Sequence, residues 1–387
     1  MPATIAALDQ VVSNLGPEDR RRFDRMYEFV KSEAVVLPPP AMENWIAAAF
    51  KYLAPTREGI LEAIRRQPII HVLARATGQA TLFNAIRSQR PIEAKDATDL
   101  EKEIEAARAK CSFCRPLEQT PANTFGRIGE KKTCANVAAY DGYHGLVIFE
   151  DHSPLRFRHG EFKPDEIADM IATSRAWAEK CHAEDPQARF FFLMWNCLWK
   201  AGASIIHGHA QMTVGHKFHY GKVERLRRDA LAYQRQCGAD YFADLVAIHQ
   251  SLGLAVRWGS VTALAHLVPA KEREMILVAD RFDAPDLPQA IWRALKVYAA
   301  QDVKSYNLAV YMPPLGKPDP DWKGFPVLVH LVDRGDPAAK TADVGAMEMY
   351  ASAVVSSDPF ALAEAMKQGI ADCGLTRGRG LARPGRV

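Results

Sequence analysis

The hydrophobic positions along the chain follow two different periods, and the period changes near residue 70. Apolar residues recur at helical spacing over residues 23–36 and again over residues 42–55, with the breaker Leu-Pro-Pro-Pro-Ala between them. These stretches predict a helical N-terminal region. Residues 77–91 then show a short strand pattern that runs into a basic loop, and the charged segment 95–110 predicts a solvent-exposed helix.

After this point, strand patterns surround one long helix pattern, and the arrangement occurs twice. Residues 134–214 predict two strands joined by a turn, a helix, and two further strands, and residues 259–335 repeat that order around a helix at 286–301. Regular alternation of strands and helices, the sign of a parallel doubly wound sheet, is not evident. We therefore expect an α+β fold of two half-barrels of antiparallel strands with flanking helices, joined edge to edge.

The last strand pattern of the first repeat, residues 204–214, carries three polar side chains at alternate positions. On a strand, His207, His209 and Gln211 point to one face, and the small residues between them let another element pack closely on the other face. A single histidine on a strand is usually structural, but H-x-H-x-Q between apolar residues favours chemistry. The second repeat has only His330 at the corresponding place, so we expect one half to carry the site.

Composition and charge limit the classes of protein that this chain can represent. The 387 residues are 48% hydrophobic and 25% charged, which is ordinary for a globular protein. We find no apolar run of about 18 residues and no signal peptide, and we expect a cytoplasmic protein without a membrane partner. The net charge of +3 is too small to indicate a nucleic-acid partner.

The seven cysteines are odd in number and scattered, which does not match a secreted disulfide framework. Only Cys111 and Cys114 stand close together, as a C-x-x-C pair. In a reducing compartment such a pair indicates redox chemistry or metal binding, and the choice depends on where other ligands lie.

Several motifs of this chain occur in an order that resembles the galactose-1-phosphate uridylyltransferase branch of the histidine triad (HIT) superfamily. The segment N-C-L-W-K-A-G-A-S-I-I-H-G-H-A-Q, which ends at Gln211, is similar to the Asn-x5-Gly-x-Ser-x2-His-x-His-x-Gln motif of that branch. D-G-Y-H-G-L-V-I-F-E-D-H-S resembles its glycine-x-histidine segment and ends at His152, and C-S-F-C resembles its C-x2-C pair. The matches cover about residues 77 to 214 and continue faintly to about 355. The resemblance implies a HIT-like fold duplicated in tandem and a homodimer.

The resemblance also assigns residues to roles. The substrate-binding positions that it implies are Arg87, Arg90, Asn136, Asn196, Lys200, Gly202, Ser204 and Glu348. Cationic and hydroxyl side chains in this set suit phosphates, because charge-assisted donors are what such groups require. The implied metal ligands are Cys111, Cys114, His152 and His207. A closed Cys2His2 set of this type holds a structural zinc ion, which here would fix the chain that leads to His209.

His209 is the nucleophile that the resemblance implies. A neutral imidazole nitrogen can attack the α-phosphorus of a nucleotide and form a covalent nucleotidyl-histidine, which a second phosphate reopens. We expect an acceptor such as a backbone carbonyl to hold its other ring nitrogen. Gln211 stands where the hydrolase branches commonly have a third histidine. Because an amide cannot act as an acid but can donate a hydrogen bond to a phosphoryl oxygen, transfer is favoured over hydrolysis.

The C-terminal part departs from the family pattern. Near Glu348, Met347 replaces an aromatic residue and Val354 replaces a glutamine, and His330 is the only histidine left where the family has the H-x-H of a second metal site. Val137 stands where an acidic residue follows the nucleotide-contacting asparagine. These departures leave the sugar, the base and the acceptor open.

Three functions are compatible with these patterns. We expect a nucleotidyltransferase that moves a nucleoside monophosphate between an NDP-sugar and a sugar 1-phosphate by a ping-pong route. The first alternative is a nucleotide phosphorylase that cleaves an ADP-sugar or a dinucleoside polyphosphate with inorganic phosphate. The second alternative is a zinc-stabilised nucleotide-binding module without turnover.

The same patterns predict four regions along the chain. They are an N-terminal helical extension (1–70), a catalytic HIT-like domain (71–240), a second, degenerate HIT-like domain (241–372) and a basic, disordered tail (373–387).

Overall fold

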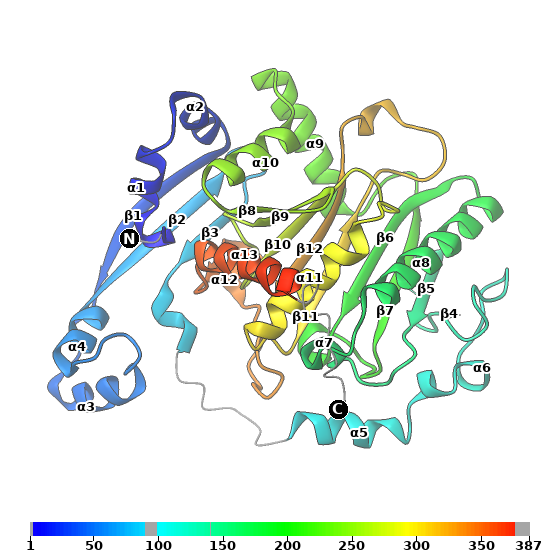
Figure 1. Ribbon diagram of the computed structural model, residues 1–387, viewed down its shortest axis with the longest axis horizontal. Helices are drawn as coiled ribbons and strands as arrows, with labels where there is room; N and C mark the ends of the chain where they lie inside the picture. Colours follow the sequence, from blue (N-terminus) through cyan, green and yellow to red (C-terminus); the bar gives the residue numbers. More distant parts are fainter. Residues whose placement is uncertain (1–2, 90–98, 140, 376–387) are drawn as a thin grey trace, which may run out of the picture.

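The computed structural model describes residues 3–89, 99–139 and 141–375, and within them two β-sheets are flanked by helices (Figure 1). In the described residues the large sheet has nine strands, in the spatial order β4-β5-β7-β6-β11-β12-β10-β9-β8, and its neighbouring strands pair antiparallel. Its strands are β4 (Thr133–Ala135), β5 (Tyr143–Ile148), β7 (His209–His216), β6 (Ala188–Asn196), β11 (Tyr306–Tyr311), β12 (Val327–Asp333), β10 (Met275–Ala279), β9 (Val261–Ala265) and β8 (Ala255–Trp258). The α+β class expected from the sequence is confirmed.

Two long helices cover one face of the large sheet. Helix α8 (Pro164–Glu184) follows β5 and precedes β6, and α11 (Leu287–Ala300) follows β10 and precedes β11. The two helices pack against each other, α8 over β5, β6 and β7 and α11 over β9 and β10 (Figure 1). Their apolar faces and the strand residues beneath them form the main hydrophobic core.

The other face of the large sheet, which we call the open face, is only partly covered. Along β6, the buried Leu193 and Trp195 alternate with the half-buried Phe192, Met194 and Asn196, and β11 alternates in the same way. Such alternation is typical of a strand with one face in the core. Near β5 and β7 the open face is covered by a small apolar cluster that joins the C-x-x-C loop to the strand residues beneath it.

The small sheet forms an arm beside this body. In the described residues its strand order is β1 (Tyr27–Val35), β2 (Arg66–Ala74), β3 (Ala80–Phe83) and β13 (Ala353–Val355), with β13 parallel to β3 and the other pairs antiparallel. The helix predicted over residues 23–36 is therefore wrong beyond Met26. Every residue of β1 pairs with β2, and its aromatic and β-branched side chains suit a strand once that partner is present.

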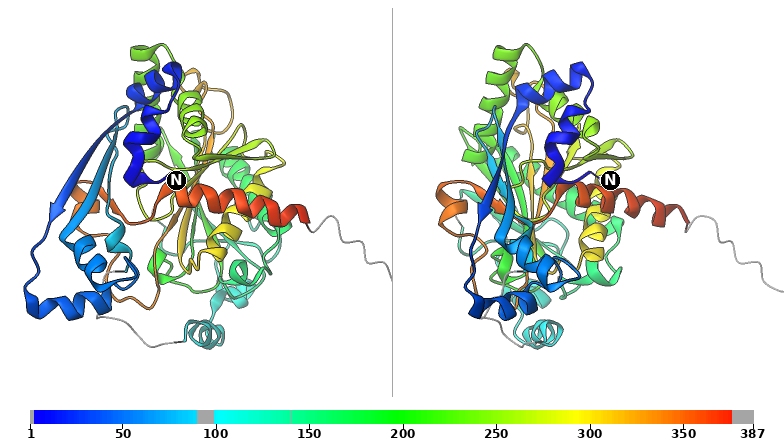
Figure 2. Two further views of the ribbon diagram at one scale, coloured as in Figure 1. Left: turned by 60° about the vertical axis from the view of Figure 1, so that its left-hand side comes forward. Right: turned by 90° about the vertical axis from the view of Figure 1, so that its left-hand side faces the viewer.

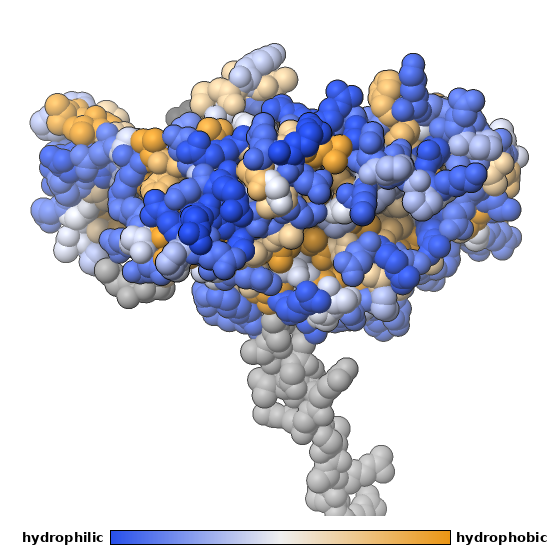
Figure 3. All heavy atoms as spheres, turned by 90° about the horizontal axis from the view of Figure 1, so that it is seen from above, coloured by the Kyte–Doolittle hydropathy of each residue, from blue (hydrophilic) through white to orange (hydrophobic). Residues whose placement is uncertain are grey.

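The far end of the arm carries a helical tip. Helices α3 (Pro40–Ala49) and α4 (Arg57–Arg65) enclose an apolar cluster of their own, separate from the main core. Figure 2 shows this tip standing away from the large sheet at the end of the long β1 and β2 strands. Leu37 is 84% exposed and Trp45 is 51% exposed. Figure 3 shows apolar spheres at this left-hand end, and others in the middle of the same view.

The remaining helices surround the body. They are α1 (Leu8–Ser13), α2 (Pro17–Met26), α5 (Leu100–Arg108), α6 (Pro116–Gln119), α7 (Arg156–His159), α9 (Gly221–Cys237), α10 (Tyr241–Ser251), α12 (Ala346–Tyr350) and α13 (Pro359–Leu375). Among the described residues, none of the helices is both long enough and apolar enough to cross a bilayer. Most of the basic tail predicted for 373–387 lies outside the described residues.

Candidate active site

Strand β7 begins at His209, so the strand predicted over residues 204–214 is wrong in its first half. The chain from Ser204 to Gly208 is irregular, and this lets His207 leave the strand direction and turn toward the C-x-x-C loop. Gly208 has to be small, because a Cβ atom there would lie 2.8 Å from the Phe149 ring. The backbone N–H of Phe149 donates to the Gly208 carbonyl at 3.0 Å, which fixes this segment against the end of β5.

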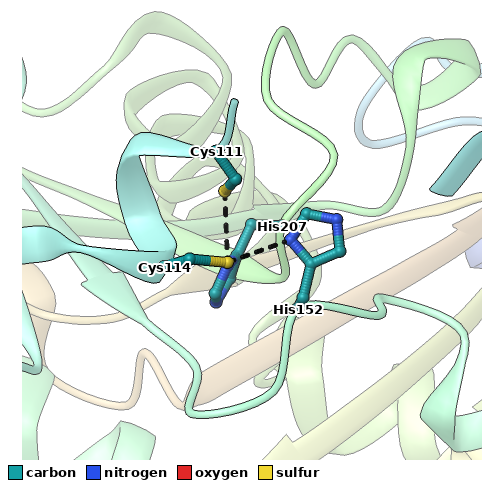
Figure 4. A group of neighbouring side chains, drawn as sticks. All are labelled: Cys111, Cys114, His152 and His207. Atoms are coloured by element: carbon teal, nitrogen blue, oxygen red, sulfur yellow. Dashed lines mark hydrogen bonds between the residues drawn. The ribbon is translucent and has the colours of Figure 1, made fainter. Parts of the chain in front are cut away.

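Four predicted metal ligands meet beside the start of β7. The ligand atoms of Cys111, Cys114, His152 and His207 all lie within 4.8 Å of one another, and no other such group occurs in the described residues. Figure 4 shows the two thiols and the two imidazoles pointing toward one another from three separate segments of the chain. Phe113, between the two cysteines, is buried against Leu146 and Ile148 of β5 and so anchors the loop.

The geometry of this cluster fits a tetrahedral metal ion. The Nδ1 atom of His207 lies 3.5 Å from each sulfur, and that of His152 lies 3.4 Å from Cys114 Sγ. Tetrahedral zinc, with bonds of about 2.3 Å to sulfur and about 2.05 Å to nitrogen, would place these atoms about 3.6 Å apart. The cluster can therefore bind such an ion with little rearrangement.

The hydrogen bonds around the cluster orient both imidazoles for metal binding. His152 Nε2 donates to the Ile104 carbonyl at 2.9 Å, and His207 Nε2 donates to the Phe149 carbonyl at 2.8 Å. Each Nδ1 therefore presents its lone pair to the thiols, as in metal-ligating histidines held by carbonyls. Burial and the neighbouring Cys111 thiol raise the pKa of Cys114 to about 11, so two thiolates side by side require a cation.

His209 is buried and held in one orientation. Its Nδ1–H donates to the carbonyl of His207 at 2.8 Å, which leaves Nε2 with a lone pair. The ring packs edge-on against Phe113, with 5.1 Å between the ring centroids, and the residue is 5% exposed. Burial lowers the pKa of His209, so the imidazole is neutral near pH 7. Its geometry is therefore that of a positioned nitrogen nucleophile.

Gln211 and Asn136 meet at a histidine to which the sequence had assigned no role. The Oε1 atom of Gln211 lies 3.1 Å from His144 Nε2, and the Nδ2 atom of Asn136 lies 3.0 Å from the same nitrogen. Asn136 directly follows the short β4, which ends at Ala135. The glycine-x-histidine segment was the available signal for His144, but sequence alone gave it no partner.

Asn196 lies on the same face of the sheet as these residues. Met194 of β6 pairs with Gln211 of β7, and Asn196, two residues further on, points to the same face. Its Oδ1 accepts a hydrogen bond from Asn307 Nδ2 at 2.6 Å, and Asn307 of β11 is the cross-strand partner of Asn196. Sequence reasoning missed Asn307, because the pairing of β6 with β11 joins the two halves of the chain.

The loop after Asn196 contains three further predicted residues. Gly202 has a φ of 93° at the end of a short 3-10 turn, a left-handed conformation that favours glycine. Ser204 follows two residues later, at an exposed position at the start of the irregular segment. Lys200 Nζ donates to the carbonyl of Ala339 at 2.9 Å and also to that of Thr341, so it anchors a C-terminal loop.

Other predicted contacts lie away from β7 within the chain. Glu348 is in α12, next to the small sheet, where its carboxylate accepts the N–H of Gly345 at 2.9 Å (Figure 1). Arg87 is exposed in a short 3-10 helix after β3. Arg90 lies outside the described residues.

His330 lies on the open face in the same cross-strand row as Gln211. The row runs from Gln211 through Met194 and Ala309 to His330, and three strand spacings of about 4.8 Å place its ends about 14 Å apart. His330 Nδ1 donates to the buried carboxylate of Glu274 at 3.0 Å. The second half therefore has a hydrogen-bonded histidine and carboxylate at the position where the first half has Gln211, on the strand that begins with His209.

Comparison with known proteins gives a match at the level of fold. Comparison of the sequence with protein-family models finds no match, and no curated protein matches either. The chain is similar to the solved structure of an ADP-glucose phosphorylase from Arabidopsis thaliana with bound ADP-glucose, at a TM-score of 0.57 and 17% identity, over 76% of this chain and 97% of that one.

Two further solved structures have the same fold. A GalT-like protein from Arabidopsis thaliana matches at a TM-score of 0.54 and 17% identity, over 67% of this chain and 91% of that one. A uridylyltransferase matches at 0.53 and 15% identity, over 79% of this chain and 99% of that one. These matches confirm, at the level of the fold, the resemblance recognised in the sequence.

Proposed function

We propose, from the fold that this chain shares with uridylyltransferase and ADP-glucose phosphorylase structures, that it is a nucleotidyltransferase acting through His209. It moves a nucleoside monophosphate between an NDP-sugar and a sugar 1-phosphate. The observation that carries the proposal is the hydrogen bond from His209 Nδ1 to the His207 carbonyl, which directs a neutral Nε2 to the substrate. This is the arrangement that nucleophilic catalysis by imidazole requires.

The reaction takes place in two displacements on phosphorus. The Nε2 lone pair of His209 attacks the α-phosphorus, the bond from phosphorus to the bridging oxygen breaks, and the sugar 1-phosphate leaves with that electron pair. A phosphate oxygen of the acceptor then attacks the same phosphorus, and the P–N bond breaks and returns its electrons to His209. A phosphate leaving group needs no proton, because its second pKa is only about 6.

The chain's other residues bind and orient the phosphates. Gln211 donates its amide N–H to a phosphoryl oxygen of the intermediate, which stabilises developing charge. Asn136 contacts the nucleoside, and Asn196 and Ser204 lie along the strand end and the loop beside His209. We assign Arg87, Arg90, Lys200, Gly202 and Glu348 to substrate binding by their positions in the sequence motifs, with Lys200 acting through the loop that it anchors.

We assign the Cys2His2 cluster to a structural zinc ion. Cys111, Cys114, His152 and His207 would hold it, and its chemistry there is coordination alone. With His207 fixed on both sides, its carbonyl is a rigid acceptor for His209 Nδ1–H, so the cluster orients the nucleophile without touching substrate.

A tandem repeat and a dimer are part of the same proposal. The order β5-β7-β6 on one side of the large sheet mirrors β10-β12-β11 on the other, each with one helix, which supports duplication of a HIT-like unit. Because Glu348 lies by the small sheet in its own chain, we propose that it serves the site of a second copy in a homodimer. Light scattering at micromolar concentration tests this, and a monomer at all concentrations would argue against it.

A nucleotide phosphorylase is the second candidate. The changed residues around Glu348 favour it, since a phosphorylase needs no sugar site for the acceptor, and one protein of the same fold is an ADP-glucose phosphorylase. Inorganic phosphate would then carry out the second displacement on an ADP-sugar or a dinucleoside polyphosphate. Turnover with phosphate alone, and none with sugar 1-phosphates, would select this candidate.

Intact-mass spectrometry tests the proposed chemistry directly. After incubation with UDP-glucose, ADP-glucose or a dinucleoside tetraphosphate, the protein should gain the mass of one nucleotidyl group, that is, a nucleoside monophosphate less one water, and that mass identifies the base. His209→Ala should abolish the adduct, whereas His216→Ala, at the other end of β7, should keep it. Turnover by the His209→Ala variant would refute the assignment of the nucleophile, and a wild-type protein that binds nucleotide without an adduct would be a binding module.

A further inference from the structure

The imidazole of His144 is shared by two side-chain amides that make opposite demands on it. Asn136 Oδ1 accepts the backbone N–H of Ala138 at 3.0 Å, so the other end of that amide, Nδ2, faces His144 Nε2. An amide nitrogen only donates, and this contact therefore requires a lone pair on Nε2. Gln211 Oε1 only accepts, and its contact with the same nitrogen requires a proton on Nε2.

A neutral imidazole can make only one of these two hydrogen bonds at a time. Burial lowers the pKa of His144, which keeps the ring neutral with a single proton. With that proton on Nδ1 the ring binds Asn136, and with it on Nε2 the ring binds Gln211. Exchange with solvent moves the proton between the two nitrogens without net gain or loss.

The orientation of Gln211 follows from the state of this ring. When Nε2–H donates to Gln211 Oε1, the amide N–H groups of Gln211 point the other way and can donate to an anionic phosphoryl group. Turned end for end, Gln211 would present its carbonyl oxygen to that group, which is repulsive. His144 itself is almost fully buried on β5, so it acts through its neighbours and not on substrate.

We propose that His144 is a positioning residue that couples nucleotide contact at Asn136 to the orientation of Gln211. The inference rests on the proposed function and extends it to the control of the same site. When a nucleoside hydrogen-bonds to the Asn136 amide, Asn136 no longer contacts His144 Nε2. The ring proton then moves to Nε2, which donates to Gln211 Oε1 and holds Gln211 in the orientation for phosphoryl transfer. The site is then fully assembled only when a nucleotide is bound.

The test is the single-turnover rate constant for adduct formation at saturating nucleotide, with UDP-glucose or ADP-glucose, whichever labels the wild-type protein. His144→Leu should lower it about tenfold, less than the roughly 100- to 1,000-fold cost of deleting a transition-state donor, because Gln211 stays in place and only its orientation is no longer fixed. His144→Gln should restore it to within about threefold, because a glutamine amide reaches the place of Nε2 and donates to Gln211. Thr213→Val is the matched control. Thr213 of β7 is the cross-strand partner of His144 on β5, and its hydroxyl has no hydrogen-bond partner among the described residues.

Double variants separate coupling from a structural role. With His144 present, the effects of Asn136→Ala and Gln211→Ala on the rate constant should not add. In the His144→Leu background, the two effects should add. His144→Leu should add no loss to Gln211→Ala. An equal tenfold loss in the Gln211→Ala background, or additivity in both backgrounds, would overturn the inference while leaving adduct formation intact. A wild-type protein that forms no adduct would instead refute the proposed function, and with it this inference.

Discussion

The attachment of the N-terminal α2 to the body depends on one buried carboxylate, and replacing it gives a quantitative test. Asp244 of α10 accepts hydrogen bonds from Arg22 Nε at 3.0 Å, Arg25 Nη2 at 2.7 Å and Tyr233 Oη at 2.6 Å. Its side chain is 11% exposed, and that of Arg22 is 17% exposed. Asp244→Asn removes the most buried of the three carboxylate charges that Arg22 contacts, and leaves Arg22 with the more exposed Asp19 and Glu18.

The expected loss of stability is about 3 kcal/mol. Breaking a buried pair from one side costs about 3–5 kcal/mol when it leaves an uncompensated charge. The lower end applies because Arg22 keeps its pair with Asp19, and because the Arg25 side chain, 37% exposed, can regain water. The matched control is Asp24→Asn in α2, whose ion pair with Arg20 is about half exposed and should contribute less than about 1 kcal/mol.

The same carboxylate predicts a dependence on pH. Burial acts to raise the pKa of Asp244, but the hydrogen bonds from Tyr233, Arg25 and Arg22 outweigh it and hold the pKa below its ordinary value. Because the folded pKa is the lower one, the stabilisation is present above the unfolded value of about 3.9 and is lost as the pH falls through the folded pKa. The difference between wild type and Asp244→Asn should therefore shrink in acid.

Urea titration followed by circular dichroism measures the free energy of unfolding at each pH, and limited proteolysis reports release of α2. We expect Asp244→Asn to unfold at lower urea and to be cut first in the N-terminal region. If Asp244→Asn were as stable as Asp24→Asn at pH 7, the reasoning about this buried network would be wrong.

Three further predictions concern the site. Cys111→Ser should abolish stoichiometric zinc binding, measured by elemental analysis, and should destabilise the fold. Cys237→Ser, at an exposed free thiol, should change neither the zinc content nor the stability. Equal zinc contents in the two variants would contradict the Cys2His2 assignment. Gly208→Ala should cost about 1–3 kcal/mol by thermal unfolding and slow adduct formation, because its methyl group meets the Phe149 ring; an unchanged rate would separate that packing from catalysis. Gly202→Ala should cost about 1–2 kcal/mol from its positive φ alone, and an unchanged melting temperature would show that the loop relaxes.

Much of the fold class could be predicted from local pattern. The short apolar run of residues 190–196 and the long helical pattern of residues 163–182 correspond to β6 and α8. A short apolar run suits a buried strand, and apolar residues at helical spacing give a helix one buried stripe. The helix prediction failed beyond Met26 for the opposite reason. The apolar spacing there suits a helix, but β2 pairs with every residue from Tyr27 to Val35, and that partner is distant in sequence.

The sequence by itself determined which atoms could do chemistry here. Cys111 and Cys114 were recognisable by their spacing. The remaining candidates were recognisable by their places in motifs that resemble a known family, because metal binding and attack on phosphorus each require particular side chains; they are His152, His207, His209 and Gln211.

Only the tertiary structure decided how those atoms are aimed. The carbonyl of His207 selects which nitrogen of His209 is free, and the carbonyls of Ile104 and Phe149 select the metal-binding nitrogens. His144 between Asn136 and Gln211 likewise depends on the pairing of β4, β5 and β7. Apart from the contact between His209 and His207, the hydrogen bonds to the carbonyls and to Gln211 join segments distant in sequence. Their direction is set by strand pairing and packing, which no local pattern encodes.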